Sequence, residues 1–391
     1  MKILRVIPSV NTECGGPVNG LINTTQGLVD RGHEVSIATL DAPGSLWLKD
    51  FPYQVYSFRS RLGNYSFSKQ FENWLKEKVS CYDVVIIHGI WQFHSYATAK
   101  VCRDCSVPYV VFTHGMLDPW FNVTHKLKAA KKWVYWLIFE RRVINGANAV
   151  LFTSEEERIL ARKSFLPYSP EERVVAYGSS RELDTGIDSG EVFLERFPEL
   201  RNKKFLLFLS RIHEKKGVDL LIDALAQCGD IPDNFSLAIA GPGSQALIVE
   251  LNDRAKKLGI SEKIQWLGML DGVLKWGAYK ASDCFILPSH QENFGIVVAE
   301  ALSSATPVLI TDKVNIWREI IAQEAGYAEN DTVQGVISLL KSWFKNSDSQ
   351  KDRMRENALM CYEKNFSIEA AVVSLEFELL RVVNSHATIK G

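Results

Sequence analysis

The chain alternates between short apolar runs and helix-like segments, and it does so in two separate series. The first series places strand candidates at residues 2–7, 34–40, 53–58, 83–87, 109–113, 149–153 and 173–176. The second series places them at residues 204–210, 235–240, 263–267, 283–287 and 307–311. Strands that alternate with helices build parallel sheets, because each helix returns the chain to the edge at which the previous strand began. The sequence therefore predicts an α/β protein with two Rossmann-like, doubly wound sheets.

A stretch that is typical of a linker separates the two series. Residues 177–190 are rich in glycine and small polar side chains. With 391 residues, the chain is long enough for two domains of ordinary size, each with its own core. We place an N-terminal domain at residues 1–180, a second domain at residues 200–365 and a C-terminal helix within residues 366–391.

Composition argues against several classes of function. The formal net charge of −1 and the isoelectric point near 6.7 give no global attraction to nucleic acid, which is therefore not an expected partner. Seven scattered cysteines fit reduced thiols better than a disulfide framework, and Cys102 and Cys105 are either incidental thiols or a metal or redox pair. We find neither a secretory signal nor an apolar run of about 18 residues, so we expect a cytoplasmic protein, with the inner face of the cell membrane as its site of any lipid contact.

Two glutamates lie in a segment that reads as strand, loop and helix. The apolar run 284–287 is closed by a proline, and residues 294–304 are rich in alanine and valine. Glu292 therefore follows the strand, where ligands bind in open parallel sheets, and Glu300 lies two turns into the helix. The amides of Asn293, Phe294 and Gly295 at the helix N-terminus are suited to a phosphate. Either glutamate alone is an ordinary solvated carboxylate.

The full string Pro-Ser-x-x-Glu-x-Phe-Gly-x-x-x-x-Glu-Ala over residues 288–301 resembles the donor-site signature of the retaining nucleotide-sugar glycosyltransferases of family four. These enzymes have the GT-B fold, in which two Rossmann-like domains face each other across a cleft. The resemblance implies that Glu292 contacts the donor hexose, that Glu300 contacts the ribose hydroxyls, and that the C-terminal helix crosses back to the first domain. The family usually has glycine where this chain has Ala305, a change that costs little unless the position needs a positive φ.

Cations follow the first strand of the second series, in Leu-Ser-Arg-Ile-His-Glu-Lys-Lys-Gly over residues 209–217. From composition, this is a solvated charge cluster. It also resembles the phosphate-binding pair of the family, which implies that Arg211 and Lys216 bind the donor diphosphate. The resemblance further assigns Gly241 to a glycine turn of the donor site and Met269 to a position where the main chain reads the nucleobase.

The first domain offers a glycine pair and a histidine. Gly15 and Gly16 lie between a strand and a helix, an anion-accepting turn whose spacing is not the dinucleotide fingerprint. His114 follows a strand and precedes a glycine, and a lone histidine is as often structural as functional. The resemblance to the family's N-terminal pattern implies that the glycines lie beside the donor diphosphate or the acceptor. It also implies that His114 lies beside the transferred sugar.

Three further residues are candidates for contacting the acceptor. His88 and Trp91 follow the strand before the one that precedes His114, on the same predicted rim, and Asp118 either orients the acceptor or begins a turn before a proline. The helix expected at residues 126–144 mixes lysine and arginine with aromatic residues. Such a helix either packs its apolar stripe in the core or lies on an anionic membrane or a lipid-linked substrate.

The function that the resemblance implies is transfer, with retention, of a hexose from a nucleotide sugar. We expect a UDP-hexose such as UDP-glucose as donor and a hydroxyl of a polysaccharide or lipid-linked saccharide as acceptor. No Asp-x-Asp occurs in the sequence, so we expect no metal and no other cofactor. We also find no obvious carboxylate pair set for double displacement, so with the retention that the resemblance implies we expect a front-face mechanism. Two alternatives stay open: a GT-B epimerase that acts on a UDP-sugar, and a nucleotide-sugar-binding protein without turnover.

Overall fold

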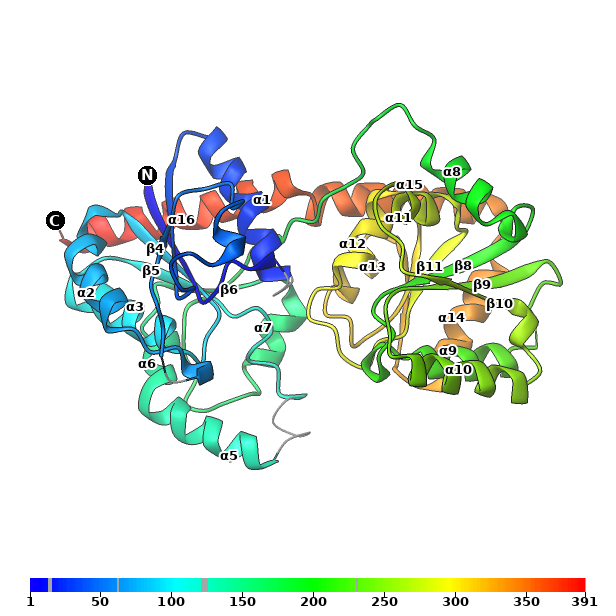
Figure 1. The fold of residues 1–391 in the computed structure, drawn as a ribbon, viewed down its shortest axis with the longest axis horizontal. Coiled ribbons are helices and arrows are strands. Elements are labelled where there is room, and N and C mark those ends of the chain that lie inside the picture. Colours follow the sequence, from blue (N-terminus) through cyan, green and yellow to red (C-terminus); the bar gives the residue numbers. More distant parts are fainter. Residues whose placement is uncertain (13–15, 62, 121–125, 230, 391) are drawn as a thin grey trace. The chain divides into compact units, whose positions relative to one another are not determined.

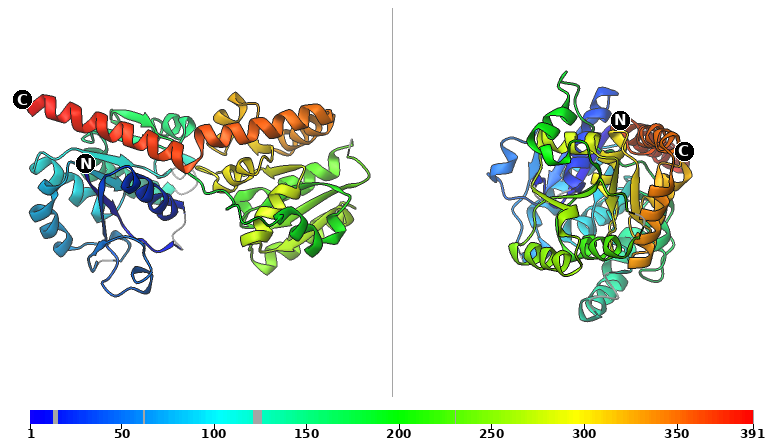
Figure 2. Two further views of the ribbon diagram at one scale, coloured as in Figure 1. Left: turned by 90° about the horizontal axis from the view of Figure 1, so that it is seen from above. Right: turned by 90° about the vertical axis from the view of Figure 1, so that its right-hand side faces the viewer.

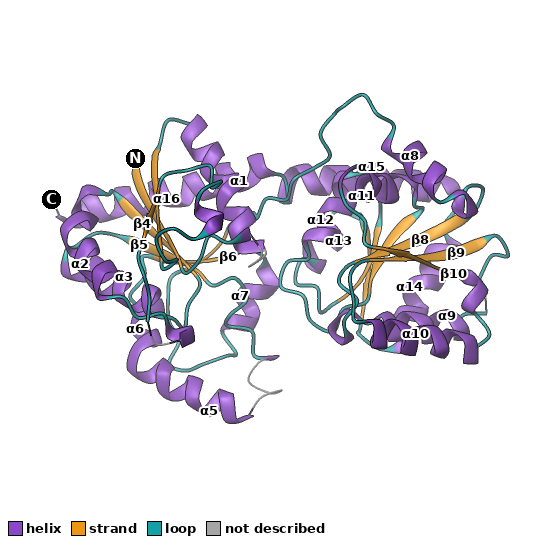
Figure 3. Ribbon diagram, in the orientation of Figure 1, coloured by secondary structure: helices purple, strands orange, loops and turns teal. Residues whose placement is uncertain are grey.

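The computed structural model describes residues 1–12, 16–61, 63–120, 126–229 and 231–390. The chain divides into two compact units. The first unit holds Met1–Gly178 and the segment that begins at Ile368, and the second holds Ser179–Ser367. In each unit, helices cover both faces of one parallel sheet (Figures 1 and 3). The two doubly wound sheets predicted from the sequence are therefore present.

The sheet of the first unit has seven strands in the order β3-β2-β1-β4-β5-β6-β7. These strands are β1 Lys2–Ile7, β2 Glu34–Thr39, β3 Val55–Ser57, β4 Val84–His88, β5 Tyr109–Phe112, β6 Ala149–Phe152 and β7 Glu172–Val174. The helices of this unit are α1 Gly16–Asp30, α2 Lys69–Lys78, α3 Phe93–Asp104, α5 Lys126–Tyr135, α6 Arg141–Ile144, α7 Glu155–Ala161 and α16 Ile368–Lys390. A π-helical turn, Trp136–Glu140, joins α5 to α6.

Alternation along the strands places apolar side chains on both faces of this sheet. Leu4 and Val6 of β1 belong to one buried cluster, whereas Ile3 belongs to the cluster on the opposite face. The helix α16 covers that opposite face (Figure 2), where Val372 and Leu379 pack in the same cluster as Ile3. The C-terminal helix therefore belongs to the first unit, although it follows the second in the sequence.

The sheet of the second unit has six parallel strands in the order β10-β9-β8-β11-β12-β13. These strands are β8 Lys204–Leu209, β9 Phe235–Ala240, β10 Ile264–Gly268, β11 Cys284–Leu287, β12 Val308–Thr311 and β13 Gly326–Glu329. The helices are α8 Ser189–Arg196, α9 Val218–Gln227, α10 Gln245–Lys257, α11 Gly272–Ala281, α12 Ile296–Ser303, α13 Trp317–Ala322, α14 Val333–Lys345 and α15 Asp348–Asn365. The sequence did not predict β13, because the run Gly-Tyr-Ala-Glu is short and only partly apolar.

The expected linker, residues 177–190, is partly wrong, because its last two residues begin the helix α8. Phe193 of α8 is fully buried. A Cβ atom on Gly277 of α11 would lie 2.0 Å from the carbonyl oxygen of Ser189, so the two helices pack backbone to backbone. Residues 189–196 are consequently part of the second unit.

Candidate active site

The clearest site in the second unit lies where the strand order reverses. The chain runs from β8 outward through β9 and β10, and then returns to β11 on the other side of β8. Ligands of doubly wound folds bind at such a switch point, at the carboxyl ends of the strands. Gly217, in the loop after β8, has φ 68°, and a Cβ atom there would lie 2.0 Å from the carbonyl oxygen of Pro288 after β11. Only glycine allows the two loops to come this close.

This close approach brings together two residues that the sequence singled out independently. Lys216 of the β8 loop forms an ion pair with Glu292 of the β11 loop. Both side chains are mostly buried, with exposed fractions of 13% and 22%. A cation and a carboxylate side by side at a switch point are suited to a ligand that carries both a phosphate and hydroxyl groups.

The backbone of Glu292 is fixed by the loop that follows β12. Its N–H donates to the carbonyl oxygen of Lys313 at 2.9 Å, and its own carbonyl oxygen accepts from the N–H of Asn315 at 3.0 Å. Gly295, with φ 76°, is the N-cap of α12, and Phe294 is buried against Phe366. The structure thus begins α12 at Ile296, after the three residues predicted to offer their amides.

Arg211 lies at the start of the loop after β8, next to the loop that follows β9. It is exposed and has no ion-pair or hydrogen-bond partner among the residues that the structure describes. Gly241 at the end of β9 has φ 135°, and a Cβ atom there would lie 1.8 Å from the carbonyl oxygen of Ser210. Beside this contact is a cavity of about 660 Å³, whose lining includes Arg211, His213 and Gly243. An exposed guanidinium at a cavity is available to an anionic ligand.

Glu300 lies on α12 and is buried, with an exposed fraction of 7%. One carboxylate oxygen accepts from Lys275 Nζ at 2.8 Å, and the other accepts from the Tyr279 hydroxyl at 3.1 Å. Each oxygen keeps a further lone pair for a hydroxyl group of a ligand. The sequence interpretation did not single out Lys275 and Tyr279. They are four residues apart on α11 and so lie on one face of the helix, shortly after the exposed Met269.

In the first unit, His114 follows β5 with the left-handed φ of 48°. The neighbouring turn is held by Glu157 of α7, which has an exposed fraction of 4%. One oxygen of Glu157 accepts from the Thr113 hydroxyl at 2.8 Å and from the Gly115 N–H at 2.6 Å. The other accepts from the N–H and the hydroxyl of Thr153, at 2.8 and 2.7 Å. A strained backbone position with so many fixed contacts is typical of a functional loop.

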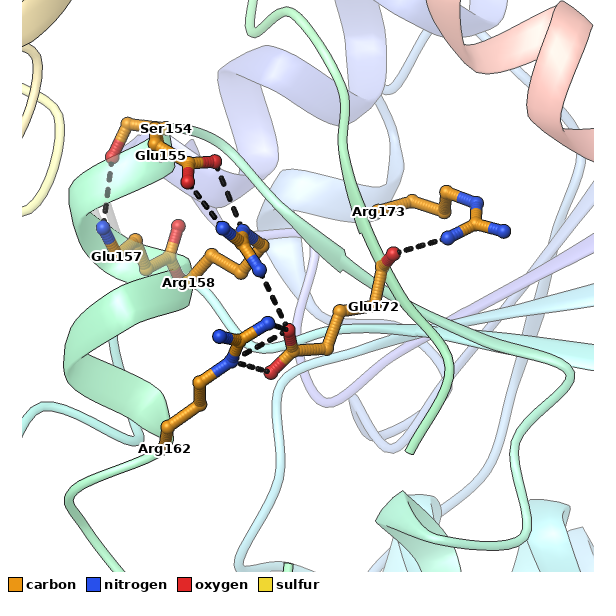
Figure 4. A network of polar contacts seen from close by, with 7 residues as sticks. All are labelled: Ser154, Glu155, Glu157, Arg158, Arg162, Glu172 and Arg173. Carbon is orange, nitrogen blue, oxygen red and sulfur yellow. Dashed lines mark hydrogen bonds and ion pairs between the residues drawn. The ribbon is translucent and has the colours of Figure 1, made fainter. Parts of the chain in front are cut away.

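Glu157 was missed by the sequence interpretation because Glu155-Glu-Glu157-Arg reads as a solvated helix start. Ser154 is the N-cap of α7 and accepts from the N–H of Glu157 (Figure 4). On the outside of the same helix, Arg158 and Arg162 pair with Glu172 of β7. The pattern Ser-x-x-Glu is a known helix-start signal, but it does not indicate whether the glutamate side chain is exposed or buried.

His88 is not on a rim, as predicted, but is buried with an exposed fraction of 2%. Its Nε2 lies 3.2 Å from Arg5 Nε, and its Nδ1 lies 3.1 Å from His114 Nε2. Burial, and then the positive charge of Arg5, lower the pKa of His114 to about 3 and that of His88 well below its ordinary value. In this structure His88 offers no surface to an acceptor and instead forms a hydrogen bond with His114.

The other candidates of the first unit lie at separate places. Trp91, with φ 75°, donates from its indole N–H to the Met116 carbonyl oxygen at 3.2 Å. Asp118 accepts from the Trp120 N–H at 2.8 Å, which is the geometry of a turn. This fits one of its two expected roles, the start of a turn before a proline. Gly16 begins α1, and Gly15 lies outside the described residues.

The helix after residue 125 shows both faces that the sequence suggested. Trp136 and Glu140 are fully buried, which confirms packing in the core. On another side Trp133, Val134, Leu137 and Ile138 are exposed, with fractions of 38%, 59%, 45% and 50%. Exposed apolar side chains in one helical segment are the feature that the membrane alternative requires.

Among the described residues, no group of three or more His, Cys, Asp or Glu side chains could hold a metal ion. Burial raises the pKa of the Cys102 thiol, which keeps it protonated. None of the described helices is long and apolar enough to span a membrane.

Comparisons with known proteins agree with these features. The family model for Glycosyl transferases group 1 matches residues 193–359, and the model for the Glycosyl transferase 4-like domain matches residues 15–178. An uncharacterised glycosyltransferase of Methanocaldococcus jannaschii is 26% identical over 364 residues, which are 87% of each chain. The alpha-monoglucosyldiacylglycerol synthase of Streptococcus pneumoniae is 28% identical over 263 residues, which are 64% of this chain and 56% of that protein.

Among solved structures, Anabaena HepE in complex with UDP and glucose matches with a TM-score of 0.71 at 19% identity. The match covers 97% of this chain and 100% of that one. This likeness confirms the predicted GT-B fold.

Proposed function

The chain belongs to the family-four type of glycosyltransferase, and on this premise we propose that it moves a hexose from a nucleotide sugar to a hydroxyl group. We propose a UDP-hexose as donor, and a polysaccharide or a lipid-linked saccharide as acceptor. UDP and glucose are bound by the Anabaena protein of similar fold, which supports this choice of donor.

The observation that carries the proposal is the meeting of Lys216 and Glu292 at the switch point of the second sheet. A nucleotide sugar has a diphosphate for the cation and sugar hydroxyls for the carboxylate. When the diphosphate binds Lys216 and the unpaired Arg211, Glu292 is released to accept from the hexose. Glu300 has lone pairs left for the ribose hydroxyls.

The same cations suggest how the leaving group is stabilised. Negative charge builds on the β-phosphate as the bond to the anomeric carbon breaks, and we propose that Arg211 and Lys216 neutralise it without a metal ion. We propose front-face attack: the acceptor oxygen bonds to the anomeric carbon, the nucleoside diphosphate leaves on the same face, and its oxygen takes the acceptor proton. The anomeric configuration is then retained. Glu157 does not serve as a nucleophile, because both its oxygens accept hydrogen bonds from the protein.

For the acceptor we favour a lipid-linked saccharide. The exposed apolar residues of the α5 segment, Trp133, Val134, Leu137 and Ile138, directly follow Lys131 and Lys132 in the sequence, a mixture typical of helices that rest on anionic lipid. Relatives named for lipid products, such as the Streptococcus pneumoniae synthase, support the same direction.

Vesicle flotation tests this membrane contact. The double variant L137E/I138E should lose binding to vesicles with anionic lipid, whereas L183E, at an 80% exposed position of the second unit, should bind like the wild type. Equal binding of the two variants would remove the α5 segment as the contact.

Product analysis tests the function itself. Full-length protein is incubated with UDP-hexoses, with and without lipid-linked saccharides, and the products are separated. Transfer releases UDP in an acceptor-dependent way, an epimerase makes a new UDP-sugar without acceptor, and a binding protein does neither. Either of the last two results contradicts the proposal.

A further inference from the structure

A buried arginine, Arg5, is linked to His114 of the first unit through His88. Arg5 lies in the middle of β1 with an exposed fraction of 1%. Its Nη1 donates to the Leu21 carbonyl oxygen at 3.1 Å, to the Thr24 hydroxyl at 2.9 Å and to the Thr25 hydroxyl at 2.8 Å. A buried charge is costly unless it is hydrogen-bonded, so a guanidinium held by neutral acceptors of α1 calls for a functional reason.

Arg5 and His88 share one face of the sheet. β1 pairs with β4 so that Arg5 lies opposite Ile86, two residues before His88. The alternation of side chains therefore turns both to the side on which α1 lies. The Arg5 Nε atom reaches His88 Nε2 at 3.2 Å, and His88 Nδ1 reaches His114 Nε2 at 3.1 Å. The two imidazole rings are nearly parallel, at 14°.

The directions of these hydrogen bonds follow from chemistry alone. A guanidinium only donates, so His88 Nε2 accepts and carries no proton. The ring of His88 then has its proton on Nδ1 and donates it to His114 Nε2. His114 Nε2 is in turn without a proton, and the neutral ring of His114 carries its proton on Nδ1. That Nδ1 has no partner among the described residues, and the side chain is partly exposed.

We propose that Arg5 is a positioning residue which, through His88, holds His114 as the Nδ1–H tautomer and so as a fixed donor to an oxygen of the transferred sugar. That the acceptor of this hydrogen bond is a sugar rests on the proposed function. The tautomers of His88 and His114 in the free protein do not depend on it. Because burial and Arg5 also keep His114 neutral, the residue acts by donating a hydrogen bond and not as an acid. We call the hydrogen-bonded series Arg5–His88–His114 the relay. The Nε2 of His94 donates to the His88 carbonyl oxygen at 2.9 Å and so fixes the backbone at the middle of the relay.

Nitrogen-15 NMR of labelled histidine rings measures the tautomer directly in the full-length chain, with His114→Ala for assignment. The wild type should show His114 with a protonated Nδ1 and a bare Nε2, unchanged between about pH 5 and pH 8. Arg5→Met should give mixed tautomers of His114, and turnover should fall about tenfold at unchanged UDP affinity. Thr25→Val, which removes one acceptor of Arg5 but not the link to His88, should keep the wild-type tautomer.

Another variant covers the case in which Arg5→Met does not fold. The side chain of His88→Leu can neither accept from Arg5 nor donate to His114, so the fixed tautomer of His114 should be lost. A wild-type His114 protonated on Nε2, or an unchanged tautomer in Arg5→Met or His88→Leu, would overturn the proposal. If the tautomers behave as expected but no sugar is transferred, the proposed function fails and the relay stands.

Discussion

Replacing Glu157 by glutamine tests whether the loop of His114 depends on one buried carboxylate. The variant has almost the same shape, but one carboxylate oxygen becomes an amide NH₂ that meets donors instead of accepting from them. Each oxygen of Glu157 accepts from one hydroxyl and one backbone N–H. The hydroxyl of Thr113 or Thr153 can rotate to accept, but the backbone N–H of Gly115 or Thr153 cannot.

The expected magnitude follows from this count. A buried donor left without a partner costs about 1–3 kcal/mol, and loss of the charge weakens the remaining bonds, so the free energy of unfolding should fall by about 2–4 kcal/mol. For a unit of this size, 1 kcal/mol corresponds to roughly 2–4 °C in melting temperature, so we expect a decrease on the order of 5–10 °C. Turnover should fall as well, because Thr113 and Gly115 flank His114.

Thermal unfolding followed by circular dichroism measures the effect. The matched control is Glu155→Gln in the same helical turn, whose carboxylate is 40% exposed and pairs with Arg158. An exposed ion pair of this kind contributes less than about 1 kcal/mol. If Glu157→Gln melts at the temperature of Glu155→Gln, the carboxylate does not hold the loop and the reasoning is refuted.

Five further variants probe other parts of the structure. Arg211→Ala and Lys216→Ala should each lower turnover by roughly 10²-fold or more, the scale of one lost transition-state donor, and near-normal steady-state rates in both would remove the phosphate site. Glu300→Ala should mainly weaken nucleoside diphosphate binding in calorimetry, and Glu292→Gln should mainly lower transfer; the reverse pattern would mean that the two roles are exchanged. Burial raises the pKa of Glu140 to about 8, so ionisation of the unfolded chain destabilises the fold as pH rises from about 4.5 towards 8. Glu140→Gln should therefore raise the melting temperature at pH 8 but not near pH 4, and an equal gain at both pH values would contradict the shifted pKa.

Much of the fold could be predicted from apolar runs. Strands such as β4, β6 and β11 are continuous apolar segments between turn residues, which are strong signals in a doubly wound sheet, whereas β3 and β7 are short and only partly apolar. The helix α8 escaped prediction because Ser189 and Gly190 read as linker residues, and its close packing on α11 depends on a distant residue, Gly277, where any side chain would meet the Ser189 carbonyl oxygen. Ala305 has φ 55°, so the alanine in place of the family's glycine lies at a strained position that the sequence did not reveal.

The site was predicted where a motif fixes its spacing, and missed where residues distant in sequence meet. Lys216 and Glu292 were found from separate strings, and their contact follows from the strand order. Arg5 carried an available signal, since a charge inside the apolar run of a central strand requires a buried partner. The identity of that partner, His88, depends on strand pairing and register, which a single sequence does not supply.

A proton NMR time course with a UDP-hexose and a lipid-linked saccharide tests the central claim most directly, because one spectrum reports the donor and the new glycosidic bond together. We predict that the anomeric signal of the donor decays only when enzyme and acceptor are both present, and that the product signal has the α configuration of the donor. A product with the β configuration would contradict the front-face mechanism. A donor signal that stays constant with every acceptor would contradict the assignment of sugar transfer to this chain.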